Sequence, residues 1–549
     1  MFKSFNRNLV DLATFFAKLL IFWAIFLPES AIAIPQKTEQ SDRLTDLNPE
    51  QIPGSIVLKR FEIIGNRVIP DSELDALLEP YLFRPISFIE LLEVQQAITQ
   101  LFIDRGYLTS GAYIPPQKIK DRTIKIEIIE GRIEDIKIYG LKHLRSSYIR
   151  SRIEVVTEPP LNRDKLLNAL QLLQLNSRID SISAELSPGI NPGSSLLEIE
   201  IQEANTFNAE LTFNNYQAVS VGSQSRELSL GDDNVLGFGD RFEVNYINTP
   251  SSNSLGGLSY TIPLSAKEDE FQITYGYSNS SIISEPFEDL GLSSRSSYLE
   301  ANYRYPIVRT PRKEIALGFS FVHQDSQLFL MDRGFPTLAR GTDVEGVTKI
   351  SVLRFTQEYS TRGDRHVFAI NSQFNIGLNV FDATINAGDI PDSQFLIWRG
   401  QVQYISQLSD RTNLLLRGGL QLADRPLVSL EQFRAGGALS VRGYRRDRSL
   451  GDNGLFLSTE LRQPIWATSQ GDFSLELNPF FDFGRVWNND DLPVEDNTLA
   501  SLGVGLQLFW DDTFSARLDW GIPLIKDKGF QADSLQDSGI YFSLQLKPF

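Results

Sequence analysis

The chain has 549 residues, a formal net charge of −17, three histidines and no cysteine. The lack of cysteine excludes disulfide bonds, thiolate metal sites and cysteine nucleophiles, and the acidic balance argues against nucleic acid, which is bound through basic surfaces. Aromatic residues make up 11% of the chain, with 36 Phe and 17 Tyr; girdles of aromatic side chains at both membrane interfaces are one cause of such an excess.

The N-terminus has the pattern of a secretory signal peptide, which we expect to cover residues 1–33. A positively charged start precedes an apolar core at residues 19–27 and the small-residue cleavage sequence Ala31-Ile32-Ala33. A membrane anchor is the alternative, but this apolar core falls well short of the roughly 20 residues that a spanning helix needs. Residues 34–55 are polar and rich in proline, so they are predicted to form a linker.

Residues 56–204 repeat one pattern of elements twice, over 56–132 and 133–204. Each copy is predicted to contain a strand, two helices and two closing strands, the arrangement of a compact α+β domain. In the first copy we expect helices at 72–78, capped by Asp71, and at 89–105, and strands at 57–64, 112–114 and 123–129. In the second copy we expect helices at 146–153 and 163–173 and strands at 133–139, 181–186 and 195–201.

From residue 205 to the C-terminus, apolar and polar residues alternate with the period of a β-strand. Sixteen candidate strands start near residues 208, 225, 240, 257, 270, 296, 313, 348, 366, 395, 413, 454, 473, 499, 513 and 539. Long connections, the longest at 423–453, alternate with short ones, as extracellular loops alternate with periplasmic turns in outer-membrane barrels. The predicted fold is therefore mainly β, a 16-stranded antiparallel transmembrane β-barrel preceded by two α+β domains. A soluble β-sandwich or propeller is the alternative, but neither needs this loop asymmetry.

Several short motifs occur in order along this plan. They are FEIIGN at 61–66, RGYL at 105–108, AYIPPQ at 112–117, IEIIEG at 126–131 and GDDNVLGFGD at 231–240. The longest loop contains Val441, Arg442, Gly443 and Tyr444, and an F-x-D-x-G pattern on strand 13 consists of Phe480, Asp482 and Gly484. The chain resembles the haemolysin secretion/activation proteins, the transporters of two-partner secretion, over roughly residues 56–549. The resemblance implies that both repeats are POTRA domains, and the last two motifs are similar to those of the wider superfamily of barrel-assembly and polypeptide-transport proteins.

The alternation on strand 13 predicts that Asp482 faces the barrel lumen. The opposite phase, which suits lipid, consists of Phe473, Leu475, Leu477 and Phe481. The resemblance implies that the longest loop folds into the lumen and that Arg442 pairs with Asp482, where a two-pronged contact would fix the loop in place. The alternatives are a solvated loop arginine and an ordinary lumen-facing carboxylate.

The function that these patterns favour is export of a polypeptide across the outer membrane. We expect POTRA domains in the periplasm to capture an unfolded partner through an exposed strand edge and the barrel to export it. The expected partners are a secreted polypeptide of the long β-repeat kind, outer-membrane lipid and the barrel-assembly machinery, with no nucleic acid and no cofactor. A barrel-assembly factor and a diffusion porin are the alternatives, although the first usually has more POTRA copies and the second needs none. The sequence contains no G-x-S-x-G elbow, H-E-x-x-H or P-loop, so it predicts no enzyme and no nucleotide hydrolysis.

Overall fold

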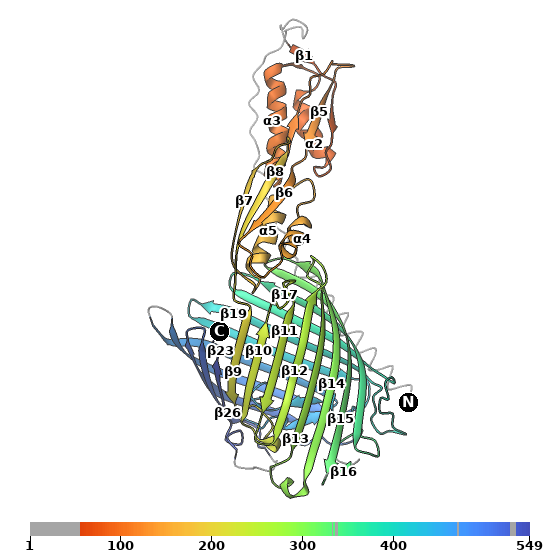
Figure 1. The fold of residues 1–549 in the computed structure, drawn as a ribbon, viewed down its shortest axis with the longest axis vertical. Coiled ribbons are helices and arrows are strands. Elements are labelled where there is room, and N and C mark those ends of the chain that lie inside the picture. Colours follow the sequence, from red (N-terminus) through yellow and green to blue (C-terminus); the bar gives the residue numbers. More distant parts are fainter. Residues whose placement is uncertain (1–54, 332, 335–338, 469–471, 528–533, 549) are drawn as a thin grey trace.

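The structure, a computed structural model, describes residues 55–331, 333–334, 339–468, 472–527 and 534–548. Two small α+β units stand one after the other on the end of a closed β-barrel (Figure 1). The expected signal peptide and residues 34–54 of the expected linker lie outside the described residues. Across the described ranges, every helix is too short or too polar to span a bilayer.

The first α+β unit has a three-stranded sheet of order β2-β5-β4, in which β2 runs parallel to β5. Two helices cover the sheet, and their buried residues, such as Ile98 and Phe102, pack against Ile126 of the central strand. A separate short ladder joins β1 to β3. The elements are β1 (Ser55–Val57), β2 (Arg60–Ile64), α2 (Asp71–Leu78), the 3-10 helix η1 (Glu79–Tyr81), β3 (Pro85–Ser87), α3 (Phe88–Asp104), β4 (Gly111–Tyr113) and β5 (Thr123–Ile129).

The two helices of this unit begin differently. The N-terminus of α3 is closed by a capping box: the Ser87 hydroxyl accepts the backbone N–H of Glu90 at 3.3 Å, and the Glu90 carboxylate accepts the backbone N–H of Ser87 at 2.7 Å. The prediction that Asp71 caps α2 is wrong, because Pro70 occupies the cap position and Asp71 is already the first helical residue. Asp71 is instead an acidic residue in the first turn, where it faces the positive end of the helix dipole.

The second α+β unit repeats the topology of the first. Its sheet has the order β6-β8-β7, with β6 parallel to β8, and β7 is a free edge of ten residues. Ile149 and Ile153 of the first helix and Leu173 of the second pack on Leu197 and Ile199 of the central strand. The elements are β6 (Arg132–Tyr139), α4 (Ser146–Glu154), α5 (Arg163–Gln174), β7 (Ile179–Pro188) and β8 (Ser194–Glu203).

Glu203 ties the end of β8 to the loop that precedes α4. Its carboxylate accepts the backbone N–H groups of Lys142, His143 and Leu144 at 2.7, 3.0 and 2.9 Å. Burial raises the pKa of Glu203, but the three N–H donors outweigh burial and hold the pKa below its ordinary value of 4.5. The chain therefore leaves the second unit toward the barrel from a fixed point.

The barrel closes by antiparallel pairing of neighbouring strands, and the last strand, β27, pairs with the first, β9. Sixteen long strands in the described ranges form the wall, and each starts within five residues of its predicted position. A two-residue strand, β16 (Arg333–Gly334), extends the outer end of β15. The sixteen are β9 (Phe207–Asn214), β10 (Ser225–Asp232), β11 (Arg241–Asn248), β12 (Ser252–Pro263), β13 (Glu270–Ser281), β14 (Leu292–Arg309), β15 (Lys313–Leu330), β17 (Val347–Arg362), β18 (His366–Leu378), β19 (Leu396–Ser409), β20 (Thr412–Ala423), β23 (Asn453–Ala467), β24 (Phe473–Trp487), β25 (Thr498–Trp510), β26 (Phe514–Pro523) and β27 (Ile540–Leu546).

The second α+β unit sits on the short turn between β10 and β11. This turn contains the GDDNVLGFGD motif, and its two later glycines give the unit room: a Cβ at Gly239 would lie 2.3 Å from the Tyr148 ring, and one at Gly237 would lie 2.6 Å from the carbonyl oxygen of His143. The Arg145 guanidinium stacks on Phe238, 3.7 Å from the ring centroid. The motif is thus the seat of the periplasmic unit on the barrel.

Candidate functional site

The connection between β20 and β23, residues 424–452, turns back into the barrel and is called the lumen loop here. Two short strands within it, β21 (Phe433–Ala435) and β22 (Ser449–Gly451), pair in antiparallel fashion and form its stem. Val441 and Tyr444 of the loop are buried against Val486 of β24 and Leu499 of β25. The loop therefore packs against the inner wall of the barrel.

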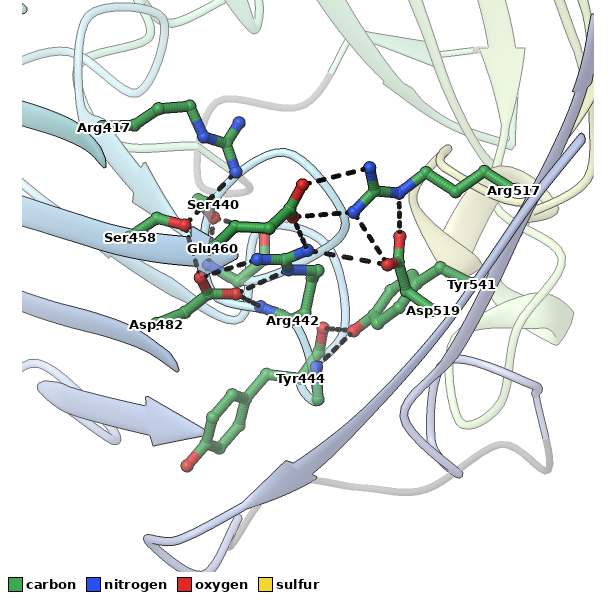
Figure 2. Close-up of polar contacts among 12 residues, drawn as sticks. Arg417, Ser440, Arg442, Tyr444, Ser458, Glu460, Asp482, Arg517, Asp519 and Tyr541 are labelled. Atoms are coloured by element: carbon green, nitrogen blue, oxygen red, sulfur yellow. Dashed lines mark hydrogen bonds and ion pairs between the residues drawn. The ribbon is translucent and has the colours of Figure 1, made fainter. Parts of the chain in front are cut away.

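Arg442 lies at the centre of the site and is only 1% exposed (Figure 2). Its guanidinium holds both oxygens of Asp482, with Nε 2.7 Å from Oδ2 and Nη2 3.0 Å from Oδ1, and its backbone N–H donates to Oδ2 at 3.1 Å. Nη1 donates to Oε2 of Glu460 at 2.7 Å. The Phe480 ring lies 3.3 Å from the guanidinium carbon. Two-pronged pairing and stacking together fix both the position and the plane of the guanidinium.

A second arginine completes the charged cluster from the wall. Arg517 of β26 donates to Glu460 Oε2 at 2.8 Å and to Asp519 Oδ2 at 2.7 Å. Asp519 Oδ1 lies 3.6 Å from Nη1 of Arg442. The hydroxyl of Ser458 donates to Asp482 Oδ1 at 2.6 Å. Three strands, β23, β24 and β26, thus contribute carboxylates to a cluster that receives a single arginine from the loop (Figure 2).

The F-x-D-x-G motif works as a seat because side chains alternate along a strand and residues 480, 482 and 484 share the lumen face of β24. Phe480 lies against the guanidinium, and Asp482 binds it. A Cβ at Gly484 would lie only 2.8 Å from Cγ2 of Val441, so glycine leaves room for the residue that precedes Arg442. The motif therefore receives two consecutive residues of the lumen loop.

The two remaining residues of the VRGY motif fix the loop to other strands. Gly443 has a φ of +94°, which favours glycine, and its N–H donates to the Tyr541 hydroxyl at 3.1 Å. That hydroxyl also hydrogen-bonds to the carbonyl oxygen of Tyr444. The Tyr444 hydroxyl lies 2.9 Å and 2.8 Å from the carbonyl oxygens of Ala500 and Ile525. The four residues thus differ in role: Val441 packs on the wall, Arg442 forms the ion pair, Gly443 allows the turn, and Tyr444 hydrogen-bonds to two other strands or loops.

The arginines that follow the motif bind neighbouring loops at the end of the barrel away from the α+β units. Arg445 pairs with a carboxylate of the β26–β27 loop, Arg446 donates to the β9–β10 loop, and Arg448 pairs with the β24–β25 and β26–β27 loops. The partners are Asp537 for Arg445, Gln217 for Arg446, and Asp496 and Asp527 for Arg448. The outer part of the lumen loop therefore gathers three other loops around itself.

The root of the lumen loop is held by a buried carboxylate, Asp452. Its Oδ1 accepts the backbone N–H of Leu427 at 2.9 Å and a hydrogen bond from Nη1 of Arg340 at 3.2 Å. Its Oδ2 accepts the backbone N–H of Asn489 at 2.9 Å. Asp452 thus joins the two ends of the loop to the β15–β17 and β24–β25 connections.

The lumen loop leaves part of the barrel interior open. A cavity of about 570 Å³ lies beside its tip, lined by polar wall residues such as Glu314, Glu358 and Gln401 and by Leu439 of the loop. Leu439 is 70% exposed. Within the described ranges, no group of three or more acidic and histidine side chains is placed to hold a metal ion.

The structure brings together all seven residues that the sequence motifs singled out. Sequence reasoning missed the other members of the cluster, namely Glu460, Arg517, Asp519 and Tyr541. A signal for two of them existed, because Arg517 and Asp519 stand in the polar phase of a strand with apolar neighbours. That phase identifies them as lumen residues but says nothing about which loop residue they meet.

Comparison with known proteins gives two family matches. Residues 193–508 match the family described as haemolysin secretion/activation protein ShlB/FhaC/HecB, and residues 56–131 match the ShlB-type POTRA domain. The chain is 23% identical over 466 residues to the heme/hemopexin transporter protein HuxB of Haemophilus influenzae, covering 82% of this chain and 80% of HuxB. It is 24% identical over 510 residues to the outer membrane transporter CdiB of Dickeya dadantii, covering 86% of this chain and 85% of CdiB.

The solved structure of CdiB from Escherichia coli has a similar fold, with a TM-score of 0.70 at 20% identity and coverage of 92% of each chain. The family match spans more than half of the chain. Relatives named as outer membrane transporters and the 16-stranded barrel both indicate that the protein resides in the outer membrane. The chain therefore belongs to the haemolysin secretion/activation family, the outer-membrane transporters of two-partner secretion, which pair with a secreted protein and carry POTRA domains in the periplasm.

Proposed function

We propose that the chain captures its unfolded partner polypeptide with the periplasmic α+β units and exports it through the barrel lumen once the lumen loop has left its seat. The observation that carries the proposal is the buried contact of Arg442 with Asp482, which holds a long extracellular loop inside the barrel. A segment held by one compact set of contacts can move between two discrete positions. A diffusion porin, the alternative from another class, needs no α+β units such as the two that precede this barrel.

Capture is supported by the free sheet edges of the two α+β units. In the first unit β4 lies at an edge of the sheet and has three residues, and in the second unit β7 lies at an edge and has ten. An extended peptide can add a strand to such an edge through backbone hydrogen bonds, with little demand on its side chains. This mode suits a long client that reaches the barrel unfolded.

Passage is supported by the composition of the lumen. The cavity beside the loop tip is lined by polar and charged wall residues, so an extended chain can cross without binding tightly at any one point. The sequence contains no P-loop, and the proposal therefore draws the driving force from folding of the client outside the cell rather than from nucleotide hydrolysis.

A disulfide between the loop and its seat tests the proposal. Val441 Cγ2 lies 2.8 Å from an ideal Cβ at Gly484, and in a disulfide the Cβ of one cysteine lies about 3 Å from the sulfur of the other. Because the chain has no cysteine of its own, Val441→Cys/Gly484→Cys forms the one possible bridge. We expect the oxidised variant to assemble but not to secrete the partner, and we expect reduction to restore secretion.

The matched control places a bridge in the wall and leaves the loop free. Val402 and Gly418 are directly opposite each other on β19 and β20, and Val402 Cγ1 lies 3.0 Å from an ideal Cβ at Gly418. Val402→Cys/Gly418→Cys should secrete equally well when oxidised and when reduced. Undiminished secretion by the oxidised Val441→Cys/Gly484→Cys variant would show that the polypeptide passes without displacing the loop.

A further inference from the structure

A pocket outside the lumen lies where the second α+β unit meets the barrel rim. It has a volume of about 380 Å³ and is enclosed by α4 and α5 on one side and by the β12–β13 and β14–β15 turns on the other. Figure 1 shows both helices directly above the periplasmic end of the barrel. Apolar side chains form much of its lining, namely Val155, Val156, Leu172, Leu173, Pro306 and Ile307.

Cationic side chains dominate the polar part of this pocket, although the chain as a whole has a net charge of −17. Arg152, Lys165, Lys267 and Arg309 line the pocket together with a single carboxylate, that of Glu268. Arg152 Nε lies 2.5 Å from Glu268 Oε1, and Arg309 Nη1 lies 3.7 Å from Oε2. The one carboxylate is therefore already shared by two arginines.

The other two cations have no such partner. Neither Lys165 nor Lys267 forms an ion pair with another described residue. Arg152 is 9% exposed and stacks on Tyr148, 3.4 Å from the ring centroid, yet its buried Nη2 has no hydrogen-bond partner among the described residues. Because a buried donor is normally satisfied, the pocket has an unmet capacity for an anion.

Burial raises the pKa of Glu268, but the hydrogen bond from Arg152 and the charges of Arg152 and Arg309 outweigh it and hold the pKa below its ordinary value. Glu268 is therefore ionised at neutral pH, and Arg152 is fixed by it. The groups with free capacity are then Nη2 of Arg152 and the ammonium groups of Lys165 on α5 and Lys267 on the β12–β13 turn, all from residues that line the pocket.

The pocket opens toward the membrane. Tyr305 of β14 is in phase with Leu299, which is 51% exposed on the lipid-facing side of the same strand, and Ile307, the unpaired residue of a bulge between Pro306 and Val308, is 54% exposed. Both stand near the periplasmic end of β14, which ends at Arg309. Tyrosine at the level of the headgroups is typical of barrel interfaces, so we expect the pocket to lie level with the phospholipid headgroups of the periplasmic leaflet.

We propose that the pocket binds the phosphate-bearing headgroup of an anionic phospholipid from the periplasmic leaflet. Arg152 Nη2, Lys165, Lys267 and Arg309 contact the phosphate, while Tyr305 and Ile307 lie beside the acyl chains. Basic side chains next to an apolar, membrane-facing surface are the combination that anionic headgroups select. Such a lipid connects α5 to two barrel turns and thereby braces the second α+β unit against the membrane.

Titration of the full-length protein in detergent with phosphatidylglycerol and with phosphatidylcholine, read by native mass spectrometry, tests the proposal. We expect a site that prefers phosphatidylglycerol by about tenfold or more, since each basic residue near a lipid surface contributes about 1 kcal/mol. Lys165→Gln/Lys267→Gln/Arg309→Gln should abolish the preference. Lys165→Gln/Lys267→Gln, which leaves every Glu268 contact in place, should lose most of it.

The control removes the same number of charges from the same rim. Arg312, Arg365 and Arg411 lie in periplasmic turns but do not line the pocket, so Arg312→Gln/Arg365→Gln/Arg411→Gln should retain the preference. A loss in this control equal to that in the pocket variant would overturn the proposal, because the effect would then be general charge. Displacement of phosphatidylglycerol by an equal concentration of inorganic phosphate would also overturn it, since the site would recognise a free anion. The assay does not involve secretion, so its outcome is independent of the proposed export function.

Discussion

Arg442→Ala and Asp482→Ala should release the lumen loop to different extents, although they break the same contact. Asp482 is fully buried, and among the described residues its ion-pair partner is Arg442 alone. Arg442 also pairs with Glu460 at 2.7 Å and lies 3.6 Å from Asp519. Arg442→Ala therefore leaves a buried carboxylate without a counter-ion, whereas Asp482→Ala leaves the guanidinium with two carboxylates.

The magnitudes follow from this difference. Removing one partner of a buried ion pair costs roughly 3–5 kcal/mol, and we expect Arg442→Ala to weaken the seated loop by about that amount. Asp482→Ala loses charge-assisted hydrogen bonds, which contribute about 1.5–3 kcal/mol, so its effect should be about 2 kcal/mol. The double variant should cost less than the sum of the two, because removing Asp482 also removes the uncompensated charge that Arg442→Ala creates.

The position of the loop can be read with a thiol reagent, because the chain has no cysteine. Val441 is fully buried when the loop is seated, so Val441→Cys should react only after release. We expect fast labelling and raised single-channel conductance with Arg442→Ala, intermediate values with Asp482→Ala, and reduced secretion with both, because export needs a loop that can also return to its seat.

The control for this experiment is an exposed ion pair of the same loop. Arg434 pairs with Asp447 at 3.2 Å and is 47% exposed, and exposed pairs contribute about 1 kcal/mol or less. Arg434→Ala should therefore leave labelling, conductance and secretion close to those of the parent protein. Fully additive effects in the Arg442→Ala/Asp482→Ala double variant, or wild-type labelling with Arg442→Ala, would refute the reasoning.

Two further predictions follow from close contacts in the structure. Gly484→Val should weaken the seated position of the loop by about 1–3 kcal/mol, because its side chain would clash with Val441. In that background, Val441→Ala should partly restore the labelling and conductance of the parent protein. The control is Gly419→Ala, whose Cβ would meet nothing within 4 Å and which should change neither quantity. Glu203 has a pKa held below 4.5 in the folded protein. Its contribution to the stability of the second α+β unit, about 1 kcal/mol or less, is therefore present above pH 4.5 and is lost as the pH falls through the folded-state pKa. Amide protection at Leu144, measured as the exchange rate relative to the intrinsic rate at each pH, should fall between pH 7 and pH values below 4.5 in the parent protein. In Glu203→Gln the protection should already be lower at pH 7 and should show no further loss.

The wall of the barrel could be predicted from sequence because its signals are local. Alternation along each segment and the lengths of the connections identify strands without knowledge of their neighbours. The helix termini were less predictable, since they depend on single residues. Ser87-Phe88-Ile89-Glu90 has the spacing of a capping box and marks the start of α3. Asp71 is a residue type that often caps helices, but Pro70 takes the cap position of α2 and Asp71 is the first helical residue.

At the centre of the site, only the contact between the lumen loop and β24 could be predicted from sequence. Alternation on β24 places Asp482 in the lumen, and the motif resemblance pairs it with Arg442. The contacts with Glu460, Asp519 and Tyr541 depend on how strands far apart in the sequence align around the barrel. Asp519, for example, stands directly opposite Tyr541 between β26 and β27, and no local pattern in either strand specifies that register.

The ion pairs that anchor the lumen loop differ in how deeply they are buried, and this difference bears on the proposed movement of the loop. The side chains of Arg442 and Asp482 are 1% and 0% exposed, those of Arg445 and Asp537 are 17% and 10%, and that of Arg434 in the stem is 47% exposed. Water and salt weaken ion pairs in proportion to their exposure, so the outer anchors exchange partners more easily than the seat. Because the guanidinium, its backbone N–H and the neighbouring Val441 all meet the same strand, these contacts are made or lost together. If the loop leaves its seat during export, as proposed, the buried contacts favour two distinct positions and the exposed anchors can exchange partners as the loop moves between them.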